Sequence, residues 1–131
     1  RHAVCVYIEN KSSFLLVKRS NEEFLGGLWE LPGLFVEPEA DGPSELEQLL
    51  DTLYGIRVNV TAFSSGIQHT YSHFKMNLNG YMAFVESAEQ FQSADRQIAW
   101  VQRKDLEQYP IHTAHRKMLE LIWSGQQSLQ L

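Results

Sequence analysis

The amino-acid sequence predicts an α/β (α+β) fold, an α/β/α sandwich in which a mixed sheet carries a helix on either side. Two observations predict it: several strand-like apolar runs, and two amphipathic segments with helical spacing, one between the strands and one after them. With 131 residues, of which 44% are hydrophobic, the chain can bury one core. We therefore predict a single domain over residues 1–125 and a polar tail over residues 126–131.

The N-terminal part of the chain has the pattern of a hairpin followed by a loop. Residues 3–9, "AVCVYIE", and residues 14–20, "FLLVKRS", are β-rich runs joined by the polar segment "NKSS". The next segment, "NEEFLGGLWELPG" over residues 21–33, contains adjacent glycines and a proline. That composition predicts a loop that enters a short strand.

The segment "DGPSELEQLLDTLYGI" carries the most regular helical pattern. Ser44 and Glu47 have the spacing of a capping box, and Gly55 stands where a helix C-terminus favours glycine. Leucines recur with the i, i+3, i+4, i+7 spacing of one helical face: Leu46, Leu49, Leu50 and Leu53.

Strand patterns return after this helix. Residues 57–67 are β-rich, and residues 69–86, "HTYSHFKMNLNGYMAFVE", alternate with period two. Asn79-Gly80 is a possible hairpin turn, but the alternation keeps its phase across the pair, which favours one long strand. The residues that share this phase are Phe74, Met76, Leu78, Met82 and Phe84.

A short strand and a last helix complete the chain. We predict a strand over residues 97–102, a helical turn over 103–109 and a helix over 112–125, with Gly125 at its end. The apolar face of this helix is expected to carry Ala114, Met118, Leu121 and Ile122.

Composition excludes several classes of protein. There is no apolar run of about 18 residues and no leader-like segment, and Cys5 is the only thiol, so we expect no membrane span, no disulfide framework and an intracellular, in bacteria cytoplasmic, location. Because the chain opens on Arg1 without a methionine, we expect it to be part of a longer protein. The net charge of −5 does not favour nucleic-acid binding by electrostatics alone. A local basic patch would have to come from Lys18, Arg19, Lys75, His112, His115, Arg116 and Lys117.

The order of elements, with "LWELPG" leading into a helix that ends in Gly-Ile, resembles the Nudix fold. The hydrolytic motif of that family, G-x5-E-x7-R-E-U-x-E-E-x-G-U with U a bulky aliphatic, places glutamates that bind a divalent metal against a pyrophosphate. Counted from Gly33, only the first glutamate is matched, by Glu39. Counted back from Gly55-Ile56, the Arg-Glu and Glu-Glu pairs become Gln48, Leu49, Thr52 and Leu53. The sequence thus lacks the metal-binding set, and we interpret Glu45, Glu47 and Asp51 as the solvated side of the helix.

Three segments resemble the C-terminal domain of adenine DNA glycosylases of the MutY type, which would be a non-catalytic, degenerate Nudix fold. They are "LLVKRSNEEFLGGLWELPG", "IQHTYSHFKMNLNGY" and "PIHTAHRKMLELI". In that family a Phe-Ser-His or Phe-Thr-His motif contacts 8-oxoguanine opposite the mismatched adenine. The matching residues are Tyr71, Ser72 and His73, with tyrosine in place of phenylalanine. Weaker expected DNA contacts are His69, Lys75, His115 and Arg116.

The resemblance also implies what the rest of such a protein does. The partner of this domain would be double-stranded DNA with an A:8-oxoguanine or A:G mismatch. A catalytic domain of the same chain would excise the adenine and hold a [4Fe-4S] cluster on four cysteines. Residues 1–131 contain one cysteine and cannot hold such a cluster. With the hydrolytic motif also incomplete, we expect no cofactor, metal site or catalytic residue here.

Serine suits the task of reading 8-oxoguanine. This base differs from guanine by an oxygen at C8 and a hydrogen on N7, so N7 changes from an acceptor to a donor. A hydroxyl group both donates and accepts hydrogen bonds and can respond to both changes. One such contact is worth about 1 to 3 kcal/mol of discrimination.

Other interpretations of "HTYSH" are a zinc site, a Ser-His nucleophile and a plain strand end. His69 and His73 have the i, i+4 spacing that suits a helix but not a strand, and a third ligand is not evident. Neighbouring residues of a strand, such as Ser72 and His73, point to opposite faces, which disfavours a nucleophile pair. A strand end with a packed Tyr71 and solvated histidines remains the structural alternative.

Two alternative functions follow from the same sequence. The first is a Mg²⁺-dependent Nudix pyrophosphohydrolase whose atypical site uses Glu39, Glu45, Glu47 and Asp51. The second is a protein-interaction module that does not bind DNA.

Overall fold

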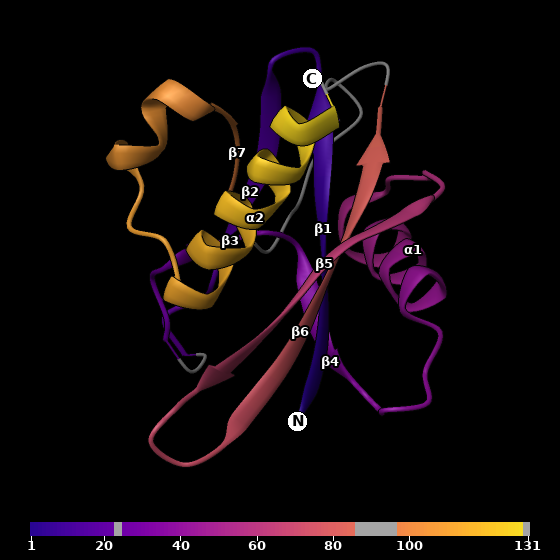
Figure 1. Cartoon of the computed structure of the whole chain (residues 1–131), viewed down its shortest axis with the longest axis vertical. Coiled ribbons are helices and arrows are strands. Elements are labelled where there is room, and N and C mark those ends of the chain that lie inside the picture. The colour runs from indigo at the N-terminus through magenta and orange to yellow at the C-terminus, as the bar shows by residue number, and fades with distance from the viewer. Residues whose placement is uncertain (23–24, 86–96, 130–131) are drawn as a thin grey trace.

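The computed structural model describes residues 1–22, 25–85 and 97–129, with the side chains of residues 127–129 left aside. Figure 1 shows strands at the centre of the molecule and helices on either side. The elements are β1 (His2–Asn10), β2 (Ser13–Lys18), β3 (Trp29–Glu30), β4 (Gly33–Val36), α1 (Gly42–Tyr54), β5 (Ala62–Thr70), β6 (Lys75–Phe84), β7 (Ile98–Gln102), the 3₁₀ helix η2 (Arg103–Gln108) and α2 (Thr113–Leu129).

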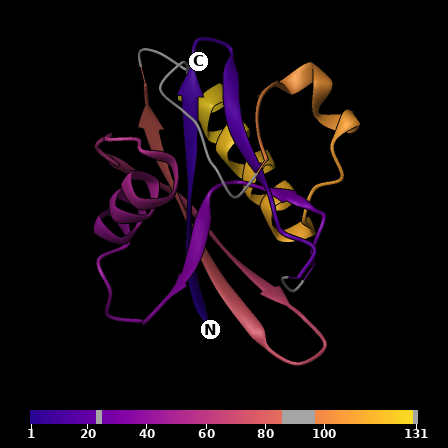
Figure 2. The ribbon, with the colours of Figure 1, turned by 180° about the vertical axis from the view of Figure 1, so that it is seen from behind.

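The strands form one mixed sheet, as predicted. Its main order is β3-β2-β1-β6-β5, while β4 also pairs with β1 and β7 with β2. Strand β1 runs parallel to β6, and the other pairings are antiparallel. Helices α1 and α2 lie on opposite sides of β1 in both views (Figures 1 and 2). The predicted α/β fold class is therefore confirmed.

The two faces of β1 supply the two halves of the core. Cys5 and Tyr7 belong to the cluster that includes α2, whereas Val6 and Ile8 belong to the cluster that includes α1. This follows from the period-two geometry of a strand, in which successive side chains point to opposite faces. All four side chains are buried, so β1 reads as a continuous apolar run.

Strands β1 and β2 separate soon after their hairpin, and the β3–β4 segment crosses the space between them. Pairing of β1 with β2 is limited to Glu9 and Asn10, and further along β1 residues His2–Cys5 pair with β4. The Val6 N–H donates to the Pro32 carbonyl oxygen at 3.0 Å. A Cβ at Gly33 would lie 2.5 Å from the Val4 carbonyl oxygen, so this approach requires glycine.

A buried carboxylate, that of Glu30, lies in this β3–β4 segment, which we call the crossover. Both Glu30 oxygens accept hydrogen bonds from Arg19 Nη1 at 3.0 Å, and His115 Nε2 lies 3.4 Å from Glu30 Oε2. The Leu31 N–H donates to His115 Nδ1 at 3.2 Å. Because a buried charge must be paired and hydrogen-bonded, these contacts fix Arg19 and the start of α2 against the crossover.

Helix α1 confirms the predicted segment and corrects its beginning. The N-cap is Asp41, whose carboxylate accepts from the Ser44 N–H at 3.3 Å, so Ser44 lies in the first turn and does not cap. Pro43 occupies the first turn, where its missing N–H is harmless. Gly55 ends the helix with φ of 66°, as expected. Leu53, expected to be buried, is 38% exposed, and Tyr54 packs into the core in its place.

Strands of the second half differ from prediction in two places. Strand β5 begins at Ala62, so residues 57–61 of the β-rich run are outside it; Ile56 and Val60 bury their side chains beneath α1 as a connection. The segment that begins at residue 69, expected as one alternating strand, is divided: His69 and Thr70 end β5, a turn follows, and β6 begins at Lys75. Strand β6 continues through Asn79-Gly80, which confirms that this pair is not a hairpin turn. Phe84, at its end, is 63% exposed and does not contribute to the core.

The last helix is longer than predicted and buries a different face. Helix α2 runs through Gly125 to Leu129, because Gly125 is not among the described glycines with positive φ that could end it. Its buried face includes His115 and Leu119, whereas Leu121, expected on that face, is 42% exposed. None of the helices among the described residues combines the length and hydropathy needed to cross a membrane.

We predict that Glu30→Gln lowers the free energy of unfolding by about 3 kcal/mol, because it leaves the Arg19 guanidinium without its ionised partner in a largely buried place. Urea denaturation of the chain at neutral pH measures the effect. Glu37→Gln, the same change on an exposed glutamate beyond β4, is the control and should shift stability by less than about 0.5 kcal/mol. Equal effects in the two variants would contradict the assignment.

Candidate functional site

The motif residues Tyr71, Ser72 and His73 lie together in the turn between β5 and β6. Thr70 and Lys75 form the last strand pair, and the Tyr71 N–H donates to the Phe74 carbonyl oxygen at 2.8 Å. Ser72 and His73 are exposed. Figure 1 shows this end of the hairpin projecting beyond both helices. The turn is thus accessible to a large partner.

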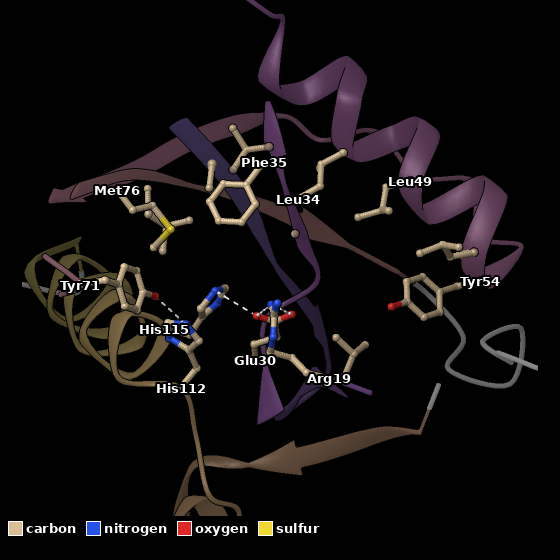
Figure 3. Close-up of a pocket in the computed structure, with 16 residues that line it drawn as sticks. Arg19, Glu30, Leu34, Phe35, Leu49, Tyr54, Tyr71, Met76, His112 and His115 are labelled. Atoms are coloured by element: carbon tan, nitrogen blue, oxygen red, sulfur yellow. Dashed lines mark hydrogen bonds and ion pairs between the residues drawn. The ribbon is translucent and has the colours of Figure 1, made fainter. Parts of the chain in front are cut away.

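Tyr71 connects the turn to the start of α2. Its hydroxyl lies 2.6 Å from His112 Nε2 (Figure 3). Its ring packs against Phe74, with ring centroids 4.8 Å apart, and against His69, at 4.7 Å. The side chain is half-buried, in contrast to its two exposed neighbours.

His112 caps α2 with its side chain and its backbone. Its Nδ1 accepts a hydrogen bond from the Ala114 N–H at 3.2 Å, and its carbonyl oxygen accepts from the Arg116 N–H at 3.0 Å. Since Nδ1 is an acceptor, the neutral ring carries its proton on Nε2 and donates it to the Tyr71 hydroxyl oxygen. The sequence alone left the role of His112 open, and the helix cap was not foreseen.

The weaker predicted DNA contacts occupy different environments. Lys75 is exposed next to the turn. Lys117 donates to His69 Nδ1 at 3.4 Å, and Arg116 lies 3.4 Å from Glu107, an exposed pair of little energetic weight. The expectation that His115 contacts a phosphate requires correction, because this side chain is buried between the crossover and α2.

Burial keeps the two histidines at the start of α2 neutral at pH 7. It is the main cause that lowers the pKa of His112 to about 4, with Arg19 and His69 contributing. Burial likewise lowers the pKa of His115 to about 3, with smaller effects from His112 and Arg19. The neutral state agrees with the hydrogen bonds, since each Nδ1 accepts one.

A pocket of about 250 Å³ lies between the start of α2, the crossover and α1 (Figure 3). Its polar wall consists of Arg19, Glu30, Tyr71, His112 and His115. Its apolar wall includes Leu34, Phe35, Leu49, Leu53 and Tyr54. Sequence reasoning missed this pocket and the role of Glu30; the available signal was a carboxylate between the apolar residues of "LWELPG".

The apolar wall coincides with positions that the hydrolytic motif reserves for carboxylates. The helix ends at Gly55 in the left-handed conformation and Ile56 is buried, which supports counting the motif back from this pair. In that register Leu49 and Leu53 replace glutamates, and both line the pocket. No group of three histidine, cysteine, aspartate or glutamate side chains within the described ranges is placed to hold a metal ion.

Two acidic side chains of α1 have structural partners. Glu47 Oε1 accepts a hydrogen bond from the Val60 N–H at 3.4 Å, and Asp51 lies 3.8 Å from Arg57. Glu39 is exposed before the helix. These carboxylates therefore do not converge on the pocket.

Comparison with known proteins shows the family of this chain. The NUDIX domain family matches residues 3–121. The chain belongs to this family. Human adenine DNA glycosylase is 25% identical over 118 residues, which are 88% of this chain and 21% of that protein. This NUDIX chain therefore spans about a fifth of the length of that relative.

Solved structures share the fold. The C-terminal domain of mouse MUTYH, in complex with human PCNA, superimposes with a TM-score of 0.75 at 20% identity, covering 98% of this chain and 88% of that chain. A MutT protein from Methanosarcina mazei gives a TM-score of 0.79 at 18% identity, covering 99% and 95%. At these identities the structures establish the NUDIX architecture, which hydrolases and the MUTYH domain have in common.

We predict that the free energy of unfolding falls as pH is lowered from about 6.5 towards 4, because the unfolded chain binds protons on histidines that stay neutral in the fold. Their stabilisation is fully present above the unfolded pKa of about 6.5 and is lost towards the folded pKa. His112→Asn retains a capping side chain but cannot ionise. The slope of its free energy of unfolding against pH should therefore be flatter than that of the native chain, by up to about 1.4 kcal/mol per pH unit.

Urea denaturation of both proteins between about pH 7 and pH 5 measures these slopes, in a range above most carboxylate titration. His73→Asn, on the exposed turn, is the matched histidine control. Parallel curves for the native chain and His112→Asn would show that His112 does not contribute.

Proposed function

We propose that this chain is the lesion-reading domain of an A/G-specific adenine DNA glycosylase. In this proposal Ser72 hydrogen-bonds to 8-oxoguanine opposite the mismatched adenine, with Tyr71 and His73 beside it. The observation that carries it is the exposed position of Ser72 and His73 at the end of a projecting hairpin. The replacement of motif glutamates by Leu49 and Leu53 also favours recognition over hydrolysis.

The geometry of the turn suits contact with the edge of a base. Ser72 presents a hydroxyl that can accept from the N7 hydrogen of 8-oxoguanine or donate to its C8 oxygen. A short turn closed by the Tyr71 to Phe74 hydrogen bond can approach a base where a broad face could not. Discrimination by one side-chain contact is worth about 1 to 3 kcal/mol.

Charge is distributed so that DNA can approach the turn despite the overall negative charge. Between residues 20 and 56 the sequence has no lysine or arginine, and that stretch carries nine acidic residues, among them Glu37, Glu39, Asp41, Glu45, Glu47 and Asp51. Lys75 adjoins the turn, and Lys117 contacts His69 on β5. We propose that Lys75, His69 and Arg116 face the phosphate backbone, where lysine and arginine release counterions on binding.

The proposal assigns the chemistry to the remainder of the longer protein. A catalytic domain of the same chain would remove the adenine and hold the [4Fe-4S] cluster. The residues described here would contribute recognition of the opposite base, and the partner of both domains would be a duplex with A:8-oxoguanine or A:G.

We predict that Ser72→Ala in the full-length protein lowers the ratio of excision rates for A:8-oxoguanine over A:G by about fivefold or more, because one base contact is lost. Excision from A:G should be largely retained, since Ser72 does not take part in bond cleavage. Single-turnover kinetics on the two duplexes measure the ratio.

Ser20→Ala, on an exposed serine after β2, is the matched control. An unchanged ratio in Ser72→Ala would remove Ser72 from the proposed role. A full-length protein without preference between lesion and undamaged duplexes would favour the alternative of a protein-interaction module.

A second candidate function is pyrophosphate hydrolysis on a nucleotide such as 8-oxo-dGTP. The observation that favours it is the pocket beside α1, with Arg19, His112 and Tyr71 on its polar wall. The apolar residues at the carboxylate positions weigh against it, because Mg²⁺ requires hard oxygen ligands.

We predict that the chain, incubated with Mg²⁺ and a panel of nucleoside triphosphates, releases no more pyrophosphate than its Glu47→Gln variant. The variant is a fair control because the glutamine oxygen can still accept from the Val60 N–H. Release by the native chain that Glu47→Gln abolishes would establish the hydrolase and refute the recognition proposal.

A further inference from the structure

A short polar contact joins the turn that carries Ser72 and His73 to a distant part of the chain. Tyr71 and His112 are 41 positions apart in sequence, and their hydroxyl and Nε2 atoms are 2.6 Å apart. The rings also meet edge to face, with centroids 5.8 Å apart. This contact therefore links the end of the β5–β6 hairpin to the first turn of α2 (Figure 3).

The position of His112 is fixed independently of the turn. Its Nδ1 and its carbonyl oxygen both cap α2, and its backbone N–H donates to the Trp29 carbonyl oxygen at 3.0 Å. The side chain is buried. The two backbone contacts fix the main chain of His112 and the Nδ1 contact orients its ring, so Nε2 is a fixed donor towards Tyr71.

The side chains of Ser72 and His73, in contrast, depend for their position on their neighbours in the turn. Ser72 and His73 are exposed, so packing contributes little to their position. Tyr71 and Phe74 flank them, and the Tyr71 N–H closes the turn onto Phe74. Tyr71 is therefore the anchored residue that directly adjoins Ser72 in the turn.

We propose that the Tyr71–His112 hydrogen bond sets the conformation of the turn, which makes His112 a positioning residue for Ser72 and His73. The effect on DNA rests on the proposed function above, whereas the effect on the turn does not. His112 itself need not touch DNA, because its Nε2 is occupied by Tyr71.

The effect on the turn is tested by amide hydrogen exchange of residues 71–75 in this chain. Tyr71→Phe removes only the hydroxyl, and His112→Asn keeps a capping group but cannot reach Tyr71. Each should speed exchange by about twofold to tenfold, the range expected for one net hydrogen bond. The double variant should exchange no faster than either single variant, since the same contact is removed.

Tyr109→Phe is the matched control, because it makes the same chemical change on a ring that packs against Trp29. It should leave the exchange of residues 71–75 unchanged. Unchanged exchange in Tyr71→Phe, or fully additive effects of Tyr71→Phe and His112→Asn, would overturn the proposal.

The effect on recognition is tested in the full-length protein at a temperature where all variants are folded. Tyr71→Phe and His112→Asn should each lower the A:8-oxoguanine to A:G rate ratio by about twofold to tenfold, and Tyr109→Phe should not. If Ser72→Ala lowers the ratio but these two variants do not, positioning by His112 is refuted and lesion reading stands. If they speed exchange but Ser72→Ala leaves the ratio unchanged, lesion reading fails and the positioning contact stands.

Discussion

The pairing of one buried carboxylate, that of Glu30, organises the centre of this domain. Strands β1 and β2 separate after their hairpin, and the segment that crosses between them brings Glu30 into the interior. A charge in that place is stable only with partners, which are Arg19, directly after β2, and His115, on α2. The crossover, the start of α2 and the polar wall of the pocket therefore depend on the same contacts.

The start of α2 contacts the crossover through His115 and also contacts the β5–β6 turn through His112. His115 is held at the crossover through Leu31, and His112, one helical turn earlier, caps the helix and reaches Tyr71. Both rings remain neutral because burial lowers their pKa values. In this arrangement a rigid, buried helix terminus supports an exposed turn, which agrees with the general need of a binding loop for a fixed scaffold.

The sequence predicted well those features that depend on near neighbours. The leucine spacing and Gly55 located α1, and the unbroken alternation across Asn79-Gly80 identified β6 as one strand. Features that depend on partners across the fold were missed or misplaced. His115 was expected at the surface as part of a basic group with Arg116 and Lys117. Leu121 was expected in the core because the helical period alone does not fix which face turns inward. The tyrosine, serine and histidine of the turn were recognisable as a motif, but their anchor was not.

The sequence by itself determined the layers of the fold and the loss of the hydrolytic motif, since periodicity and motif spacing are local properties of the chain. Only the tertiary structure decided that Leu49 and Leu53 form the apolar wall of a pocket, that Glu30 is paired in the interior and that His112 holds Tyr71. The physical reason is distance along the chain. Leu31 and His115 are 84 positions apart and Tyr71 and His112 are 41 apart, so these contacts exist only once the sheet and α2 have packed together.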